Sequence, residues 1–136
     1  MRFPIQVAVT VLMVSLTTAC PQVSTIWLEP GSTVTHLLFH IARSRGSDRP
    51  VAVGVFRVDR CKDPADYRSA GMWVIGGKKG TVYQREVVYA RLPDGFEENH
   101  PARPLTPGCY QATVSGTGRL RFNVRPDGSV YEFPAS

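Results

Sequence analysis

The 136-residue sequence has no apolar segment long enough to cross a membrane as a helix. Its longest apolar stretch, residues 5–16, would rise only about 18 Å as a helix, whereas a hydrocarbon core of about 30 Å needs about 20 residues. Gly and Pro together supply 23 residues (12 + 11), too few for a collagen-like or low-complexity chain but enough to disfavour long helices. The sequence therefore predicts one domain built from many short elements.

The motifs of common catalytic sites are also missing. No Gly-x-Ser-x-Gly elbow is present, and Gly77-Lys78 is followed by Lys79 rather than by the Ser or Thr of a phosphate loop. Several carboxylates could serve in glycoside cleavage, but no spacing in the sequence selects a pair. We therefore expect a protein that is not an enzyme and uses no cofactor, with a hydrolase of unrecognised site as the alternative.

Histidine is scarce, with three in the chain. His36 and His40 have the spacing of two metal ligands on one helix face, but the apolar residues around them alternate with a period of two. On a strand the two imidazoles would lie about 13 Å apart, too far to share one ion. His100 follows three acidic residues that lack the spacing of a calcium loop. We therefore expect solvent-exposed histidines and no metal site.

Acidic residues are the scarcer charge, with 11 Asp and Glu against 16 Lys and Arg, a net charge of +5. Three basic residues, Arg119, Arg121 and Arg125, occupy odd positions of one predicted strand and share its face. If this face is functional, its ligand is anionic: a lipid headgroup, a cell-wall polymer or an acidic protein patch. A face that is simply solvated is the alternative.

The first 20 residues have the order of an export signal. Arg2 precedes the apolar stretch, and small residues then lead to Cys20. The segment Leu-Thr-Thr-Ala-Cys, residues 16–20, resembles the lipobox of bacterial lipoprotein precursors. The resemblance implies cleavage before Cys20, diacylglycerol on its sulfur and acylation of the new amino terminus. We therefore expect a lipoprotein signal peptide at residues 1–19 and a mature chain anchored to the cytoplasmic or outer membrane of a bacterial envelope.

The cysteine count supports this interpretation. Three cysteines is an odd number, which in an exported protein leaves one thiol to explain. If Cys20 carries lipid, Cys61 and Cys109 remain as a pair that an oxidising compartment would join across 48 positions (109 − 61). The alternative is an ordinary secretory signal, with Cys20 paired in the mature fold. Export in either case removes nucleic acid as a natural partner.

Alternating apolar and polar residues predict strands through most of the remaining chain. The predicted strands cover residues 35–42, 51–58, 72–75, 85–92, 110–115, 119–125 and 130–133, after a tether and first strand at 20–33. The polar segment 43–50 predicts a hairpin between its two flanking strands, residues 64–69 a single helical turn, and residues 93–107 a loop. Pro126-Asp127-Gly128 marks a turn into the last strand.

The segment from Leu105 to Tyr110 resembles the tyrosine corner of immunoglobulin-like and fibronectin-type sandwiches, through Leu105, Pro107, Gly108 and Tyr110. The resemblance implies a hydrogen bond from the tyrosine hydroxyl to the backbone a few residues upstream. Because Cys109 alternates with Tyr110, its sulfur should lie off the core face and fasten an edge or a loop rather than bridge two sheets. We expect an all-β fold at residues 34–136, an immunoglobulin-like β-sandwich of about seven or eight short antiparallel strands.

These features together predict a small lipid-anchored envelope protein that acts as a non-catalytic binding or assembly module. Its expected partners are membrane lipid, through acylated Cys20, and an envelope protein or an anionic cell-wall or lipid surface. The alternative is an envelope inhibitor or a metal-sequestering protein that uses the predicted loop at residues 94–107. A protruding loop would favour the inhibitor, and a flat basic face would favour the module.

Overall fold

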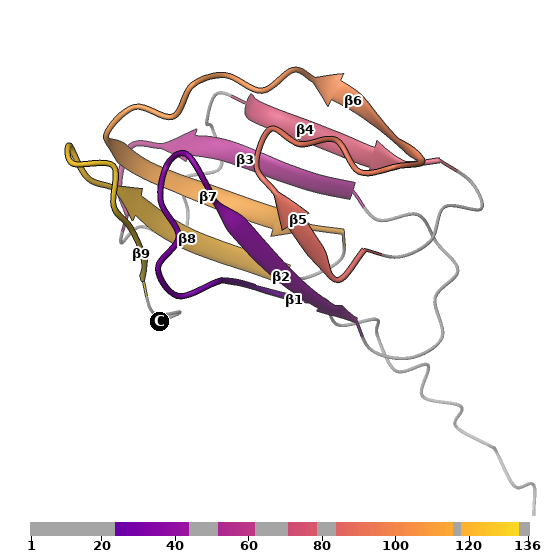
Figure 1. The fold of residues 1–136 in the computed structure, drawn as a ribbon, viewed down its shortest axis with the longest axis horizontal. Coiled ribbons are helices and arrows are strands. Elements are labelled where there is room, and N and C mark those ends of the chain that lie inside the picture. Colours follow the sequence, from indigo (N-terminus) through magenta and orange to yellow (C-terminus); the bar gives the residue numbers. More distant parts are fainter. Residues whose placement is uncertain (1–23, 44–51, 62–70, 79–83, 116–117, 134–136) are drawn as a thin grey trace, which may run out of the picture.

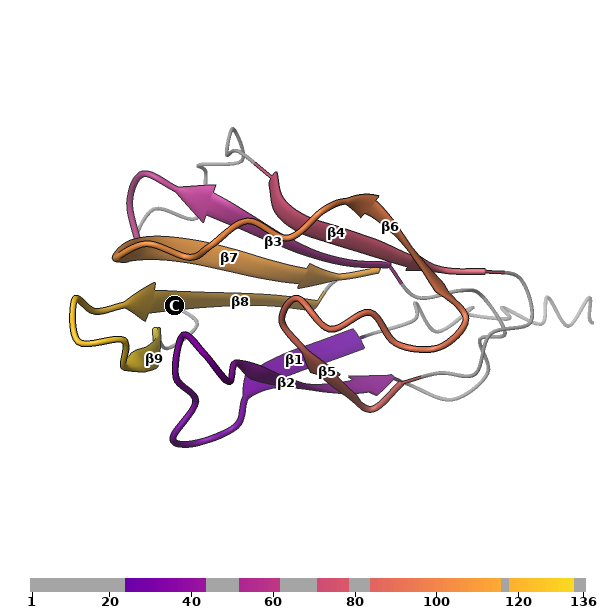
Figure 2. The same ribbon diagram turned by 45° about the horizontal axis from the view of Figure 1, so that its top comes forward.

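The computed structural model describes residues 24–43, 52–61, 71–78, 84–115 and 118–133, and these form two antiparallel sheets. The small sheet has the order β1 (Ser24–Leu28), β2 (Leu38–Arg43), β5 (Glu86–Val88). The large sheet has the order β6 (Phe96–His100), β4 (Gly71–Gly77), β3 (Ala52–Val58), β7 (Gly108–Val114), β8 (Gly118–Val124), β9 (Val130–Phe133). The sheets lie face to face (Figures 1 and 2), which confirms the predicted β-sandwich. The predicted signal peptide, Cys20 and the helical turn at 64–69 lie outside the described residues.

The core lies between the two sheets and follows from the period of two along each strand. In β1, every second residue is buried, and β8 has the same alternation. Phe39 of β2 and Phe122 of β8 meet across the sheets with ring centroids 5.9 Å apart, and Tyr110 of β7 stacks on Phe122 at 5.6 Å. Burial of each such ring stabilises the fold by about 1.5–3 kcal/mol relative to its exposure.

The strand order is immunoglobulin-like. β1, β2 and β5 take the places of strands A, B and E, and β4, β3, β7 and β8 take those of C′, C, F and G. Two further strands extend the large sheet, β6 beside β4 and β9 beside β8. The described residues therefore hold nine strands, where the sequence predicted seven or eight.

The predicted hairpin across residues 43–50 is wrong. The strand before this segment, β2, pairs with β1 and β5 in the small sheet, whereas the strand after it, β3, pairs with β4 and β7 in the large sheet. Alternation identified both strands correctly because each buries one apolar face. It does not identify a strand's neighbour, and the two apolar faces here meet across the core instead of lying side by side.

The prediction of a loop over residues 93–107 is wrong in its first half. Residues 96–100 form β6, an edge strand whose residues Glu97 and His100 pair with Gly76 and Val74 of β4. An edge strand needs backbone hydrogen bonds on one side only, and charged side chains protect its free edge from further pairing. Phe96 is the one residue of β6 that is buried, so the segment has no apolar periodicity to reveal it.

The predicted turn at residues 126–128 is confirmed and joins β8 to β9. Gly128 has φ of +84°, a conformation that glycine adopts without steric cost, and its N–H donates to the Arg125 carbonyl at 2.9 Å. The Asp127 carboxylate accepts hydrogen bonds from the Ser129 hydroxyl at 2.6 Å and from the Ser129 N–H at 2.9 Å. These hydrogen bonds lower the pKa of Asp127 and hold the turn in register with the strands.

Candidate functional site

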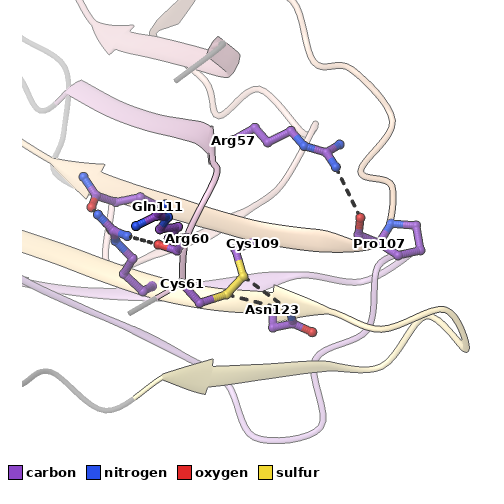
Figure 3. Close-up of a disulfide and its surroundings, with 8 residues drawn as sticks. Arg57, Arg60, Cys61, Pro107, Cys109, Gln111 and Asn123 are labelled. Atoms are coloured by element: carbon purple, nitrogen blue, oxygen red, sulfur yellow. Dashed lines mark hydrogen bonds between the residues drawn. A yellow bond between two sulfur atoms is a disulfide. The ribbon is translucent and has the colours of Figure 1, made fainter. Parts of the chain in front are cut away.

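The disulfide predicted between Cys61 and Cys109 is present on the outer face of the large sheet (Figure 3). Cys109 lies in β7, and Cys61 follows the end of β3, the strand beside it, with the Cα atoms 5.3 Å apart. Asn123 of β8, directly opposite Cys109, places its Nδ2 3.4 Å from that residue's sulfur. The bond therefore fastens the chain after β3 to its own sheet and does not bridge the sandwich, as predicted from the alternation with Tyr110.

Arg121 holds the same segment beside the disulfide. Its Nε donates to Oε1 of Gln111, the cross-strand neighbour on β7, at 2.9 Å, and its Nη1 donates to the Arg60 carbonyl at 2.6 Å. Nη2 is buried and has no hydrogen-bond partner among the residues that the structure describes. The guanidinium thus acts as an internal clamp between β7 and the chain after β3. Its donors are used within the protein, so Arg121 is less available to a ligand than the predicted anionic-partner face requires.

Replacing Arg121 by glutamine is expected to lower the free energy of unfolding by about 1–3 kcal/mol, because the buried Gln111 side chain and the Arg60 carbonyl lose their charged donor. The neighbour Arg119 on the same face provides a matched control, and Arg119→Gln should change stability less than Arg121→Gln because its side chain is exposed. Urea unfolding followed by circular dichroism measures both. Equal effects of the two substitutions would contradict the clamp.

The other two arginines of the predicted anionic-partner face differ from Arg121. Arg125 lies just beyond β8, with its guanidinium carbon 4.3 Å from the centroid of the Tyr131 ring, a cation–π arrangement. Arg119 is exposed at the start of β8 and lines a shallow hollow of about 470 Å³ together with Gly54, Phe56 and Thr113. Anion binding by this face remains a prediction and rests mainly on Arg119 and Arg125.

The segment that resembles a tyrosine corner has the expected hydrogen bond. The Tyr110 side chain is fully buried, and its hydroxyl donates to the Thr106 carbonyl at 2.6 Å. Leu105 is buried below it, and Gly108 has φ of +146°, so glycine suits the approach to β7. This corner orients the chain as it enters the large sheet.

Arg57 of β3 forms hydrogen bonds with the residues just before Tyr110, a role that the sequence did not reveal. Its Nη1 donates to the Thr106 hydroxyl at 2.7 Å, and its Nη2 donates to the Pro107 carbonyl at 3.4 Å (Figure 3). The register of β3 against β7 pairs Arg57 with Tyr110 and brings the guanidinium within 5.8 Å of the Tyr110 ring centroid. Only the strand pairing could identify this contact, because the two residues are far apart in the sequence.

The acidic segment 94–107 is fastened to the sandwich rather than projecting from it. Glu98 of β6 accepts a hydrogen bond from the indole Nε1 of Trp73 at 2.9 Å. Tyr89 packs edge-on against Trp73, with ring centroids 5.4 Å apart, and its hydroxyl donates to the Arg103 carbonyl at 2.6 Å. A segment that begins with an edge strand and is held at both of these points is a poor candidate for insertion into the cleft of a hydrolase.

Tyr89 gives the fold a dependence on alkaline pH. Burial raises the pKa of Tyr89 from its ordinary value near 10 to about 12, so the folded chain keeps its hydroxyl proton after the unfolded chain has lost it. The resulting stability is complete below pH 10 and is lost as the pH rises from about 10 to about 12. The loss should stay below about 2.7 kcal/mol, since the half-buried ring is partly screened by water. The free energy of unfolding of Tyr89→Phe should fall less between pH 10 and 12 than that of the wild type. Urea unfolding of both proteins at pH 9, 11 and 12 measures the difference.

The outer face of the small sheet carries an aromatic and acidic group. The register aligns Trp27 of β1, His40 of β2 and Glu86 of β5 in one row across the three strands. The Trp27 and His40 rings stack with centroids 5.4 Å apart and an interplanar angle of 17°. His40 forms a hydrogen bond through Nε2 with the Glu29 carboxylate. Its Nδ1 lies 3.8 Å from Oε1 of Glu86. The sequence predicted a solvent-exposed histidine here but not its aromatic and acidic neighbours.

The other two histidines lie apart from this group. His36 is exposed in the turn before β2, and His100 at the end of β6 lies 3.0 Å through its Nδ1 from the Pro101 carbonyl oxygen. Within the described ranges, no three His, Cys, Asp or Glu side chains have an arrangement that could hold a metal ion.

Comparisons with protein-family models, with curated proteins and with solved structures give no match for this chain. Within the part of the chain that the structure describes, no helix has the length and apolar character needed to span a bilayer.

Proposed function

We propose that this chain is an exported, lipid-anchored protein of the bacterial envelope whose β-sandwich acts as a non-catalytic binding or assembly module. The observation that carries the proposal is the pairing of Cys61 with Cys109. It accounts for two of the three cysteines and leaves Cys20, at the end of a signal-like segment, as the thiol available for lipid. A disulfide also suits the oxidising compartment that an export signal implies.

The proposed mechanism is presentation at a membrane surface. Acyl chains contribute about 0.8 kcal/mol per buried CH₂, enough for several chains to hold the domain without a membrane-spanning helix. β1 begins at Ser24, four residues after Cys20, and four extended residues reach at most about 14 Å. This short tether would keep the sandwich close to the lipid surface and raise its effective concentration near envelope partners. The sheet faces would then carry the recognition.

The incorporation of residues 96–100 into the large sheet favours the module over the inhibitor. An inhibitor of the predicted kind needs a projecting segment, whereas Glu98 is committed to Trp73 and the Arg103 backbone to Tyr89. The broad outer faces of the two sheets are left as the larger contact surfaces.

Lipid attachment is tested by expressing the full chain in bacteria with labelled palmitate and separating membranes by flotation. The wild-type chain should carry label and float with the membranes, whereas Cys20→Ala should be unlabelled and either soluble or an unprocessed precursor. The Cys61→Ser/Cys109→Ser double variant is the matched control and should keep the label. A Cys20→Ala chain that still matures and floats with the membranes would refute the proposed anchor.

A further inference from the structure

The outer face of the small sheet is acidic and aromatic in a protein that is basic as a whole. We define the Trp27 face by Trp27, Glu29, Leu38, His40, Glu86 and Val88. The alternation of buried and exposed residues in β1 turns Trp27 away from the core, and the residue is 42% exposed. The face carries two carboxylates, although the chain as a whole has a net charge of +5. An exposed indole stacked on a histidine that two carboxylates flank is a surface without an evident role in folding.

We propose that the Trp27 face binds a cationic side chain, Lys or Arg, presented by a protein partner. This inference rests on the proposed function, since it identifies the chemistry of the partner that the anchored module recognises. A cation over an indole face is attracted by the ring quadrupole, and Trp is the strongest of the aromatic side chains in this respect. The Glu29 and Glu86 carboxylates, which flank the stacked His40 on the same face, add electrostatic attraction for the same group and repel anions.

The geometry holds this site in place before a partner arrives. His40 is the direct cross-strand neighbour of both Trp27 and Glu86, and the three strands span roughly 10 Å, about the length of one extended basic side chain. The stacked imidazole of His40 restricts the Trp27 ring, so less conformational entropy is lost on binding.

His40 also positions the two carboxylates without cancelling their charge. It engages Glu29 through Nε2 and has Glu86 on its other side, 3.8 Å from Nδ1. Two carboxylates outnumber the single imidazole between them, so the group presents a net negative charge to a partner. Both remain accessible, with side chains 48% exposed for Glu29 and 62% for Glu86.

An apolar or anionic partner fits the same face less well. Leu38 and Val88 are only partly exposed, so they offer a small apolar area beside the indole. An anionic partner would meet two carboxylates, and the predicted anionic-partner face with Arg119 and Arg125 belongs to the opposite sheet. A cationic side chain therefore satisfies both features of the Trp27 face, the ring and the charge.

The test is isothermal titration of the purified full chain, in detergent and at low salt, with hexalysine. Hexaglutamate and the neutral sugar chitohexaose are parallel probes. Wild-type protein should bind hexalysine and neither of the others. Trp27→Leu should weaken hexalysine binding by about 3–30-fold, with Trp27→Phe retaining more affinity because its ring keeps a π face. Glu29→Gln/Glu86→Gln should weaken it at least about tenfold.

The charge-matched control is Asp94→Asn/Glu97→Gln, which removes two carboxylates near the β6 edge and should change affinity less than about twofold. Circular dichroism verifies that each variant is folded. The proposal is overturned if wild-type protein does not bind hexalysine, if the control weakens binding as much as the Trp27-face variant, if the Phe and Leu variants bind equally, or if chitohexaose binds through Trp27. Cys20→Ala separates the two proposals, because this variant should lose the anchor and still bind hexalysine. A wild-type chain that attaches to membranes but does not bind hexalysine would refute only the Trp27 face.

Discussion

Replacing both Cys61 and Cys109 by serine is expected to lower the free energy of unfolding by about 4 kcal/mol. The disulfide closes a loop of 48 positions, and the chain-entropy relation gives about this value for the conformations it removes from the unfolded state. Small domains are typically stable by about 5–15 kcal/mol, so this loss is a large share of the total. Urea unfolding of the oxidised wild type and of the double serine variant, followed by circular dichroism, measures the difference.

The same experiment has an internal control in the chemistry of the bond. Reduction of the wild-type protein should reproduce the stability of the double serine variant, and the reductant should leave that variant unchanged. Non-reducing electrophoresis should show a faster band for wild type that Cys61→Ser abolishes. Two free thiols in the mature protein, or a stability change below about 1 kcal/mol, would contradict the expected role of the disulfide.

Replacing Trp73 by alanine is expected to cost about 3–5 kcal/mol, the range for deleting a large aromatic side chain from a packed core. Trp73 is completely buried in β4, packs edge-on against Tyr89 and donates its indole hydrogen to Glu98. Its removal would leave a cavity in the core beside Tyr89, and the edge strand β6 would lose its side-chain hydrogen bond to the core. Chemical denaturation with a tyrosine or circular dichroism signal measures this effect.

Three further variants resolve the contributions of Trp73. Trp73→Phe keeps much of the packing and loses the indole donor, so it should cost less than Trp73→Ala, and Glu98→Gln keeps an acceptor and should cost about 1 kcal/mol or less. The exposed Trp27→Ala should cost less than any loss of Trp73. If Trp27→Ala and Trp73→Ala were equally destabilising, the assignment of Trp73 to the core would be wrong.

Much of the architecture was predictable because it depends on local chemistry. Alternation along residues 110–115 and 119–125 predicts strands β7 and β8 of the large sheet, since burial of one strand face requires a period of two. Pro126-Asp127-Gly128 predicts its turn because glycine and aspartate supply the backbone conformation and hydrogen bonds needed there. The odd number of cysteines predicts the Cys61–Cys109 pair, and alternation with Tyr110 predicts the face on which it lies.

The misassigned elements share a different cause, which is that pairing is a long-range property. β2 and β3 have the pattern of hairpin strands, yet each pairs with partners elsewhere in the chain because two apolar faces must close on one core. β6 has no apolar pattern, because an edge strand is stabilised by its backbone hydrogen bonds to β4. The sequence could not reveal either arrangement without the positions of the other strands.

The candidate sites divide in the same way. From the sequence alone came the proposed lipid at Cys20, the two remaining cysteines and the basic row at Arg119, Arg121 and Arg125, because each rests on residue type and spacing. Tertiary structure alone decided that Arg121 is an internal clamp. It also decided that Trp27 lies in one row with His40 and Glu86. Those contacts join residues distant in sequence, and only the register between strands determines which side chains become neighbours.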